Sequence, residues 1–135
     1  MQVTLALLAD YANVTAEGKL NILGIFDRIT VQELPAVHTQ MHLVLRLEAK
    51  PAEQDRNHNV EIRLQDPEGR TVVDVRGDLA PHGVPGRATA TNQILAFNNV
   101  QLSKPGTHAF VVTVDGAIRA EVPLGVELSP SGPAN

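Results

Sequence analysis

The chain has 135 residues, of which 43% are hydrophobic and 19% are charged, and this size and apolar content predict one folded domain with one core. Its net charge is −4 and both signs are interspersed along the sequence, so it has no basic stripe of the kind that binds nucleic acid. The absence of cysteine excludes disulfides, thiolate catalysis and thiolate metal sites.

Apolar and polar residues alternate along most of the chain, between clusters of Gly, Pro, Asn and Asp, which is typical of short antiparallel strands. We expect eight strands, at 2–10, 19–31, 41–49, 59–65, 70–76, 92–100, 107–115 and 117–128. They predict an all-β fold, an antiparallel two-sheet sandwich in a single domain over residues 1–128. A flattened or partly open β-barrel uses the same pattern and is the alternative. Residues 129–135 carry no packing side chains, and we expect a disordered tail there.

The first expected strand, 2–10, is also where a targeting or membrane segment would lie. No cationic residues precede its apolar run, and the run ends at Asp10, so it is too short to span a membrane and unlike a signal peptide. Together with the missing cysteines, this favours a cytoplasmic protein that binds neither membranes nor nucleic acid.

The second and third expected strands carry informative side chains. Gly24 interrupts an apolar run within 19–31, which is typical of a bulge or a close backbone approach, and we expect the strand to bend there. In 41–49 the alternation predicts one face in the core and one face in water. The water-facing side would carry His42, Val44, Arg46 and Glu48.

Two turn sequences predict hairpins further along the chain. The segment 66–69, Asp-Pro-Glu-Gly, suits a type I turn between the fourth and fifth strands. The pair Asp115-Gly116 is typical of a two-residue turn between the last two strands. Pro123 cannot donate a ladder hydrogen bond, so it indicates an edge or an irregularity in the last strand. Among the loops, 81–90 is where a sandwich would carry a binding surface.

Four charged residues lie in or beside the first two expected strands. They are Asp10, Lys19, Asp27 and Arg28. If these strands pair, we expect the four side chains to form a small polar network at one end of the sandwich. We interpret this network as a structural salt bridge rather than as a site built on perturbed charges.

Residues that could carry catalysis or bind a metal are scattered. His38 and His42 are four apart, which is roughly 13 Å in an extended strand and too far for one zinc ion. The other three histidines are isolated in the sequence, so we expect solvated or loop histidines. Ser103 lacks the glycine framing of a nucleophile elbow, and 83–86 has the wrong spacing for a phosphate-binding loop. Carboxylate pairs for hydrolysis stay open. We therefore assign no catalytic, cofactor-binding or metal residue.

Several segments carry a resemblance to a known family. They are LLADYA at 7–12, GKLNILGIFDRI at 18–29, FNNV at 97–100, PGT at 105–107 and VDG at 114–116. In these segments the chain resembles an uncharacterised bacterial family of small β-sandwich proteins, a domain of unknown function. The resemblance covers nearly the whole domain and implies the fold, and it implies no activity, cofactor or catalytic residue.

Because we assign no catalytic, cofactor-binding or metal residue, the sequence favours a non-catalytic function. Our first hypothesis is a non-enzymatic cytoplasmic interaction or accessory module that binds another protein or forms a homodimer, because exposed sheet edges pair unless they are protected. The alternative hypothesis is a small-ligand binder or metal-assisted enzyme, with a site at the 81–90 loop and histidines gathered from elsewhere.

Overall fold

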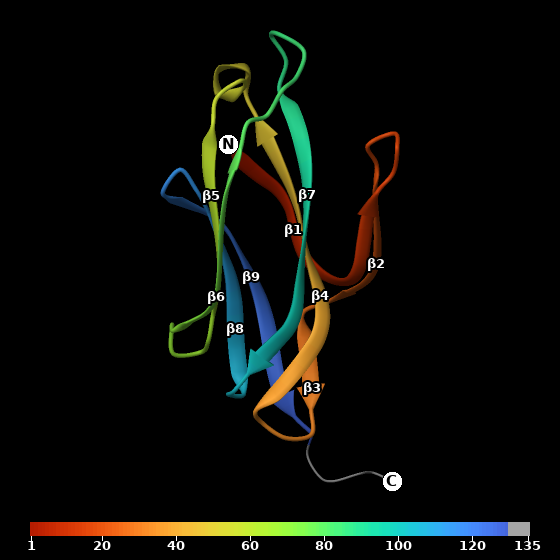
Figure 1. Cartoon of the computed structure of the whole chain (residues 1–135), viewed down its shortest axis with the longest axis vertical. Helices are drawn as coiled ribbons and strands as arrows, with labels where there is room; N and C mark the ends of the chain where they lie inside the picture. The colour runs from red at the N-terminus through yellow and green to blue at the C-terminus, as the bar shows by residue number, and fades with distance from the viewer. Residues whose placement is uncertain (130–135) are drawn as a thin grey trace.

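The computed structural model describes residues 1–129, which form two β-sheets packed face to face (Figure 1). The first sheet has the strand order β2-β1-β4-β7 and the second has the order β3-β9-β8-β5-β6. The strands are β1 (Gln2–Val14), β2 (Leu20–Phe26), β3 (Arg28–Val31), β4 (Ala36–Ala49), β5 (His58–Gln65), β6 (Thr71–Leu79), β7 (Thr89–Leu102), β8 (Gly106–Val114) and β9 (Ala117–Leu128). A short 3-10 helix, η1 (Pro51–Glu53), follows β4. The predicted two-sheet sandwich is confirmed, and the described strands do not close into a barrel.

The core lies between the two sheets and is built from alternate residues of their central strands. Leu43, Leu45 and Leu47 of β4 are almost completely buried in one cluster with Phe110 of β8. The ring of Phe110 lies 5.1 Å from that of Phe97 on β7, across the sandwich. Since each such side chain contributes roughly 1.5–3 kcal/mol when fully buried, this cluster holds the sheets together.

The segment 19–31 forms two strands in different sheets, not the single strand predicted from its apolar run. β2 pairs antiparallel with β1, whereas β3 pairs parallel with β9, from Arg28 opposite Gly125 onward. Asp27 lies at the crossing, where its C=O accepts the Gly125 N–H at 2.8 Å. The exposed carboxylate suits a position that belongs to neither sheet. Residues 1–129 therefore form nine strands, one more than the eight expected.

The C-terminal part of the second sheet contains Pro123, which the sequence predicts to lie at an edge or an irregularity of the last strand. Pro123 lies in β9 before its pairing with β3 begins at Gly125, so the missing N–H of Pro123 interrupts no ladder on that side. The tail predicted at 129–135 lies outside the described residues apart from Ser129. The N–H of Ser129 donates to the C=O of Val31 at 2.7 Å.

Both predicted hairpin turns are confirmed. In the β5–β6 turn, the Gly69 N–H donates to the Asp66 C=O at 2.9 Å, and Oδ1 of Asp66 accepts the N–H of Arg70 at 2.9 Å. In the β8–β9 turn, Asp115 and Gly116 have φ values of 51° and 83°, as a two-residue turn with a positive φ at both positions requires.

Two strands run well beyond their predicted limits. β1 continues past Asp10 to Val14, and β4 begins at Ala36 instead of 41. The extension of β1 pairs with β2 beyond the point where β1 stops pairing with β4.

Candidate functional site

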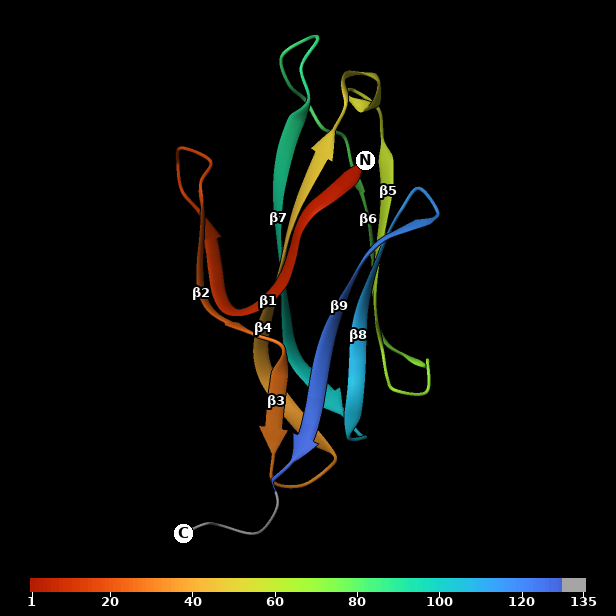
Figure 2. The ribbon, with the colours of Figure 1, turned by 180° about the vertical axis from the view of Figure 1, so that it is seen from behind.

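The β1–β2 hairpin departs from a plain sandwich, and its residues 10–26 are termed the arm. β1 pairs with β4 only as far as Ala9, whereas its pairing with β2 runs from Leu8 to Val14. The arm therefore stands on the opposite side of β4 and β7 from the second sheet (Figures 1 and 2). At its tip, the Asn92 side chain of β7 donates to the Gly18 C=O at 3.2 Å.

The arm covers part of the outer face of β4, which the sequence pattern assigns to water. His42 and Val44 on this face are 5% and 0% exposed, whereas Arg46 and Glu48 further along the same face are exposed. The Ala12 N–H donates to Nδ1 of His42 at 2.9 Å, and the Tyr11 and His42 rings lie 5.4 Å apart. The prediction of a wet face is thus wrong for His42 and Val44, because a distant segment covers them.

A His42→Ala variant is expected to loosen the arm and leave the sandwich folded. It removes the acceptor of the Ala12 N–H, and an unpaired buried donor costs about 1–3 kcal/mol. We expect the amides of residues 10–26 to exchange with deuterium about tenfold faster or more, while the amides of β8 keep their protection. Val37→Ala, an exposed position on the same strand, is the control. Equal protection of the arm in both variants would contradict docking through His42.

Gly24 lies opposite Asp10 in the arm, and this is a close approach of the kind predicted from a glycine inside a strand. The regular register of β1 with β2 on both sides places the two residues across from one another. Gly24 has a φ of +69°, and a Cβ added there would lie 2.5 Å from Oδ2 of Asp10 and 3.1 Å from its Cβ. Both the backbone conformation and the neighbouring side chain therefore favour glycine.

β2 exposes apolar side chains and one backbone edge to solvent. Leu23 and Ile25 are 64% and 65% exposed, and Tyr11 on the neighbouring strand is 48% exposed. β2 pairs only with β1, so within residues 1–129 the N–H and C=O groups of its other edge have no strand partner. Its sequence, LNILGIF, contains no charged residue. Natural sheets use charges, prolines or shortness to prevent further pairing at such an edge.

The other edge strands of residues 1–129 differ from β2 in this respect. β3 is four residues long and carries Arg28. β6 carries Asp74, Arg76 and Asp78. β7 has none of the strongly exposed large apolar side chains. Among the described edges, β2 alone combines an uncharged sequence with strongly exposed apolar side chains.

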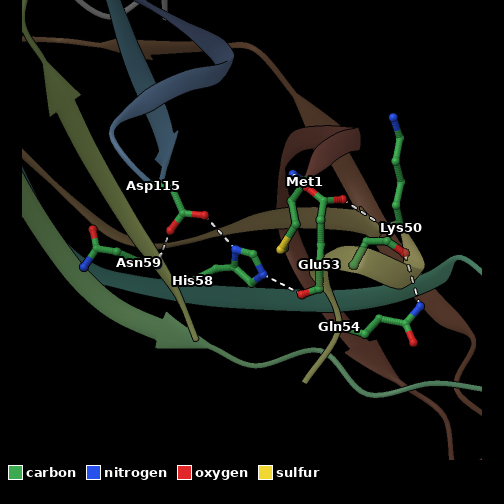
Figure 3. A network of polar contacts seen from close by, with 8 residues as sticks. Met1, Lys50, Glu53, Gln54, His58, Asn59 and Asp115 are labelled. Carbon is green, nitrogen blue, oxygen red and sulfur yellow. Dashed lines mark hydrogen bonds and ion pairs between the residues drawn. The ribbon is translucent and has the colours of Figure 1, made fainter. Parts of the chain in front are cut away.

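A second cluster centres on His58 and joins β5, η1 and the β8–β9 turn (Figure 3). Nδ1 of the buried His58 lies 2.6 Å from Oδ2 of Asp115, and Nε2 lies 2.6 Å from the Glu53 carbonyl oxygen. The other carboxylate oxygen of Asp115 accepts the Asn59 N–H at 2.9 Å. The Glu53 carboxylate pairs with the Met1 ammonium group.

Both ring nitrogens of His58 face acceptors, which favours a protonated ring that donates to each of them. The hydrogen bond to Asp115, and then the one to the Glu53 carbonyl, raise the pKa of His58 above its ordinary 6.5. The same contact lowers the pKa of Asp115. A carboxylate–histidine pair acts as a general base only when its second nitrogen reaches a substrate. Here a backbone carbonyl occupies that nitrogen, so the cluster ties three segments together.

A polar pocket of about 450 Å³ lies beside the C-terminal half of β7, between the β5–β6 turn and the start of β8. Its polar lining includes Asp66, Asn98, Asn99, Lys104 and His108. The Lys104 ammonium lies 2.6 Å from Oε1 of Glu68 and 3.8 Å from Oδ2 of Asp66, so its charge is already balanced. The pocket has a size and polarity suited to a small polar molecule.

The four charged residues predicted to form a network lie in separate places. Asp10 faces Gly24, Lys19 lies at the tip of the arm, and Asp27 and Arg28 lie where the chain crosses to the second sheet. Nε of Arg28 pairs with Glu127 on β9 at 3.4 Å. Within residues 1–129, no hydrogen bond or ion pair joins any of the four side chains to another.

Three histidines differ from the solvated or loop residues that the sequence predicts, since His42, His58 and His108 are buried. His82 is an exposed loop residue as predicted, and its Nδ1 lies 2.7 Å from Oδ1 of Asp55. Among residues 1–129, no three His, Asp or Glu side chains are placed to hold a metal ion.

The 81–90 loop is attached to the segment after η1. The Asp55 N–H donates to the Pro81 C=O at 2.9 Å, and the Gln54 side chain donates to the Arg87 C=O. These bonds hold the base of the loop against its neighbour.

Comparisons with known proteins give a family and no activity. The model of a family of unknown function, DUF6941, matches residues 4–127. No curated protein gives a significant match. Among solved structures, the chain is similar to Pseudomonas fluorescens alkylpurine DNA glycosylase AlkC bound to DNA containing an abasic site analog, with 14% identity and a TM-score of 0.45. The match covers 90% of this chain and 30% of that one, and it carries no argument about function.

No helix within residues 1–129 is long and apolar enough to cross a membrane.

Proposed function

The chain belongs to the family of unknown function DUF6941, and we propose that it is a non-enzymatic interaction module whose binding element is the arm. One observation carries this proposal: the uncharged edge strand β2 holds Leu23 and Ile25 about two-thirds exposed beside an unpaired backbone edge. Strand addition to such an edge gains main-chain hydrogen bonds for affinity, and the alternate side chains give specificity.

The way in which the arm is held supports this proposal. The Ala12 N–H bond to His42 and the Asn92 bond to Gly18 fix the arm at its middle and at its tip. A partner strand therefore meets an edge that is already ordered, and less conformational entropy is lost on binding. The buried His58 cluster adds to this interpretation, because its ring lacks a free nitrogen for proton transfer.

The test compares the arm with an equally exposed apolar site elsewhere. The variant Leu23→Lys/Ile25→Lys places charges on the edge, as natural sheets do to prevent pairing, and both positions tolerate lysine because they are exposed. We expect a partner captured from the native cell extract by the wild-type chain to bind the variant about tenfold more weakly or worse. Affinity would be measured by titrating the purified partner.

Ile118→Lys is the matched control, because Ile118 is 61% exposed and lies at the start of β9, beside the β8–β9 turn and in the other sheet. It should keep the wild-type affinity. Unchanged binding by the Leu23→Lys/Ile25→Lys variant would overturn the arm as binding element, provided that its thermal unfolding matches that of the control.

A second candidate function, the binding of a small polar molecule, is favoured by the pocket beside β7. The almost fully buried His108 lines this pocket together with Asn98 and Asn99. If a small ligand binds, we therefore place its site in this pocket, at the opposite end of β7 from the 81–90 loop that the sequence suggested.

A cytoplasmic location is part of the proposal as well, and the absence of cysteine supports it.

A further inference from the structure

We propose that the strand bound by β2 is β2 of a second copy of this chain, so that the module forms a two-fold homodimer through its arms. This inference rests on the proposed function and names the partner of the same edge. In the dimer the two β2 strands run antiparallel, with Leu23 of each copy opposite Leu23 of the other.

The hydrogen-bond pattern of the arm defines which groups are free to pair. The Thr15 N–H donates to the Lys19 C=O at 2.8 Å, so this pair is a hydrogen-bonded pair of the β1–β2 ladder. Hydrogen-bonded and non-hydrogen-bonded pairs alternate along an antiparallel ladder, and the register of β1 with β2 has no shift. The odd-numbered residues of β2 therefore bond to β1. The even-numbered residues, Leu20 to Phe26, direct their N–H and C=O groups to the free edge.

Centring the pair on Leu23 is the arrangement that uses the whole edge. β2 has seven residues and Leu23 is the middle one, so this register pairs every residue of one copy with one of the other. It sets Leu20 against Phe26 and Ile22 against Gly24 as hydrogen-bonded pairs. Leu23 then faces its own copy in a non-hydrogen-bonded pair, where side chains are closest.

Charge complementarity identifies a second copy as the partner. In this register the residues that flank β2 also meet, and Lys19 of one copy lies opposite Asp27 of the other, twice by symmetry. Within residues 1–129, neither side chain has an ion-pair partner in the single chain. The strand between them carries no charge, so self-pairing brings no like charges together. The exposed Leu23 and Ile25 side chains of both copies gather on one face of the resulting four-stranded ribbon.

The absence of cysteine allows a direct test by cross-linking. A Leu23→Cys variant has a single thiol, and the Cα atoms of a non-hydrogen-bonded pair lie about 4.5 Å apart, within the range of a disulfide. Under mild oxidation we expect it to form a covalent dimer about tenfold faster or more than Ile118→Cys, an equally exposed control. Ile25→Cys should remain as slow as the control, because its two copies are four residues out of register, roughly 13 Å.

The expected ion pairs between Lys19 and Asp27 allow a second test that needs no cross-link. Sedimentation of the wild-type chain should show a monomer–dimer equilibrium, which Lys19→Glu weakens and Lys19→Glu/Asp27→Lys restores. A wild-type chain that stays monomeric at all concentrations, or a Leu23→Cys variant no faster than Ile118→Cys, overturns the inference. Faster cross-linking through Ile25→Cys than through Leu23→Cys overturns the register. If the chain is monomeric and arm variants still lose a captured partner, the proposed function stands and self-pairing falls.

Discussion

Replacing Gly24 with alanine will release the arm from the outer face of β4. A residue with a Cβ in the left-handed region costs about 1–2 kcal/mol, and Gly24 has a φ of +69°. The new Cβ also meets Asp10, whose Oδ2 can rotate away but whose Cβ, 3.1 Å distant, moves only with the backbone. We expect a loss of about 2 kcal/mol in the local stability of the arm, measured by hydrogen exchange at residues 10–26.

The chain offers controls that separate these two causes. Gly77 of β6 has no positive φ, and a Cβ there meets nothing within 4 Å, so Gly77→Ala should leave stability unchanged or slightly raised. Asp10→Ala/Gly24→Ala removes the contact with the Asp10 carboxylate but keeps the contact with its Cβ and the backbone strain, so it should recover only part of the loss. Wild-type protection of the arm in Gly24→Ala would refute the requirement for glycine.

Replacing His58 with alanine will lower the free energy of unfolding by about 2 kcal/mol near pH 6. The substitution removes two hydrogen bonds, at 2.6 Å to Asp115 and 2.6 Å to the Glu53 carbonyl, and leaves a cavity at a buried position. Urea denaturation would measure the effect. His82→Ala, which removes an exposed imidazole paired with Asp55, is the matched control and should have a small effect.

The effect of His58→Ala should depend on pH in a defined direction. Folding raises the pKa of His58, so the protonated ring stabilises the fold fully below about pH 6.5, and this contribution is lost as pH rises through the folded-state pKa. Folding lowers the pKa of Asp115, so its contribution is present above about pH 3.8 and is lost as pH falls through its lowered pKa. The difference in the free energy of unfolding between the wild type and His58→Ala should be largest between about pH 3.8 and about pH 6.5, and it should shrink as pH rises above this range.

The variant Asp115→Asn separates the effect of the Asp115 charge from the role of this residue in the β8–β9 turn. Asparagine tolerates the φ of 51° at this position, so the β8–β9 turn is kept while the carboxylate is lost. The variant should show a flatter dependence of stability on pH than the wild type above pH 6.5. If the slope of stability against pH is unchanged, the contact with Asp115 is not what raises the pKa of His58.

Local patterns in the sequence predict the sandwich well, because strand alternation and turn chemistry act over a few residues. The inner face of β4 and both hairpin turns follow from such patterns. The burial of His42 does not, since it depends on a hairpin that folds back from residues 10–26. Asp27 was a visible break in the apolar run, but a break alone does not reveal that the chain changes sheets.

The candidate site could be predicted only in part, because its contacts also join segments that are distant in the sequence. Lys19 and Asp27 were singled out as charges near an apolar strand, and the expectation joined them within one chain. The structure sets them at opposite ends of β2, which is the arrangement that an antiparallel second copy would match. The pairing of His58 with Asp115 had no local signal, because the turn sequence Asp-Gly predicts a backbone shape and says nothing about the carboxylate's neighbour.

The parallel pairing of β3 with β9 also bears on how the protein folds. It joins residue 28 to residue 125, so forming this pair closes a loop that spans most of the chain, at a cost in chain entropy. Non-local parallel contacts of this kind slow folding, whereas the β8–β9 and β5–β6 hairpins close over a few residues. We therefore expect β3 to dock late in folding. Until it docks, the outer edge of β9 is open, and a chain caught at this stage would expose a second edge available for aggregation.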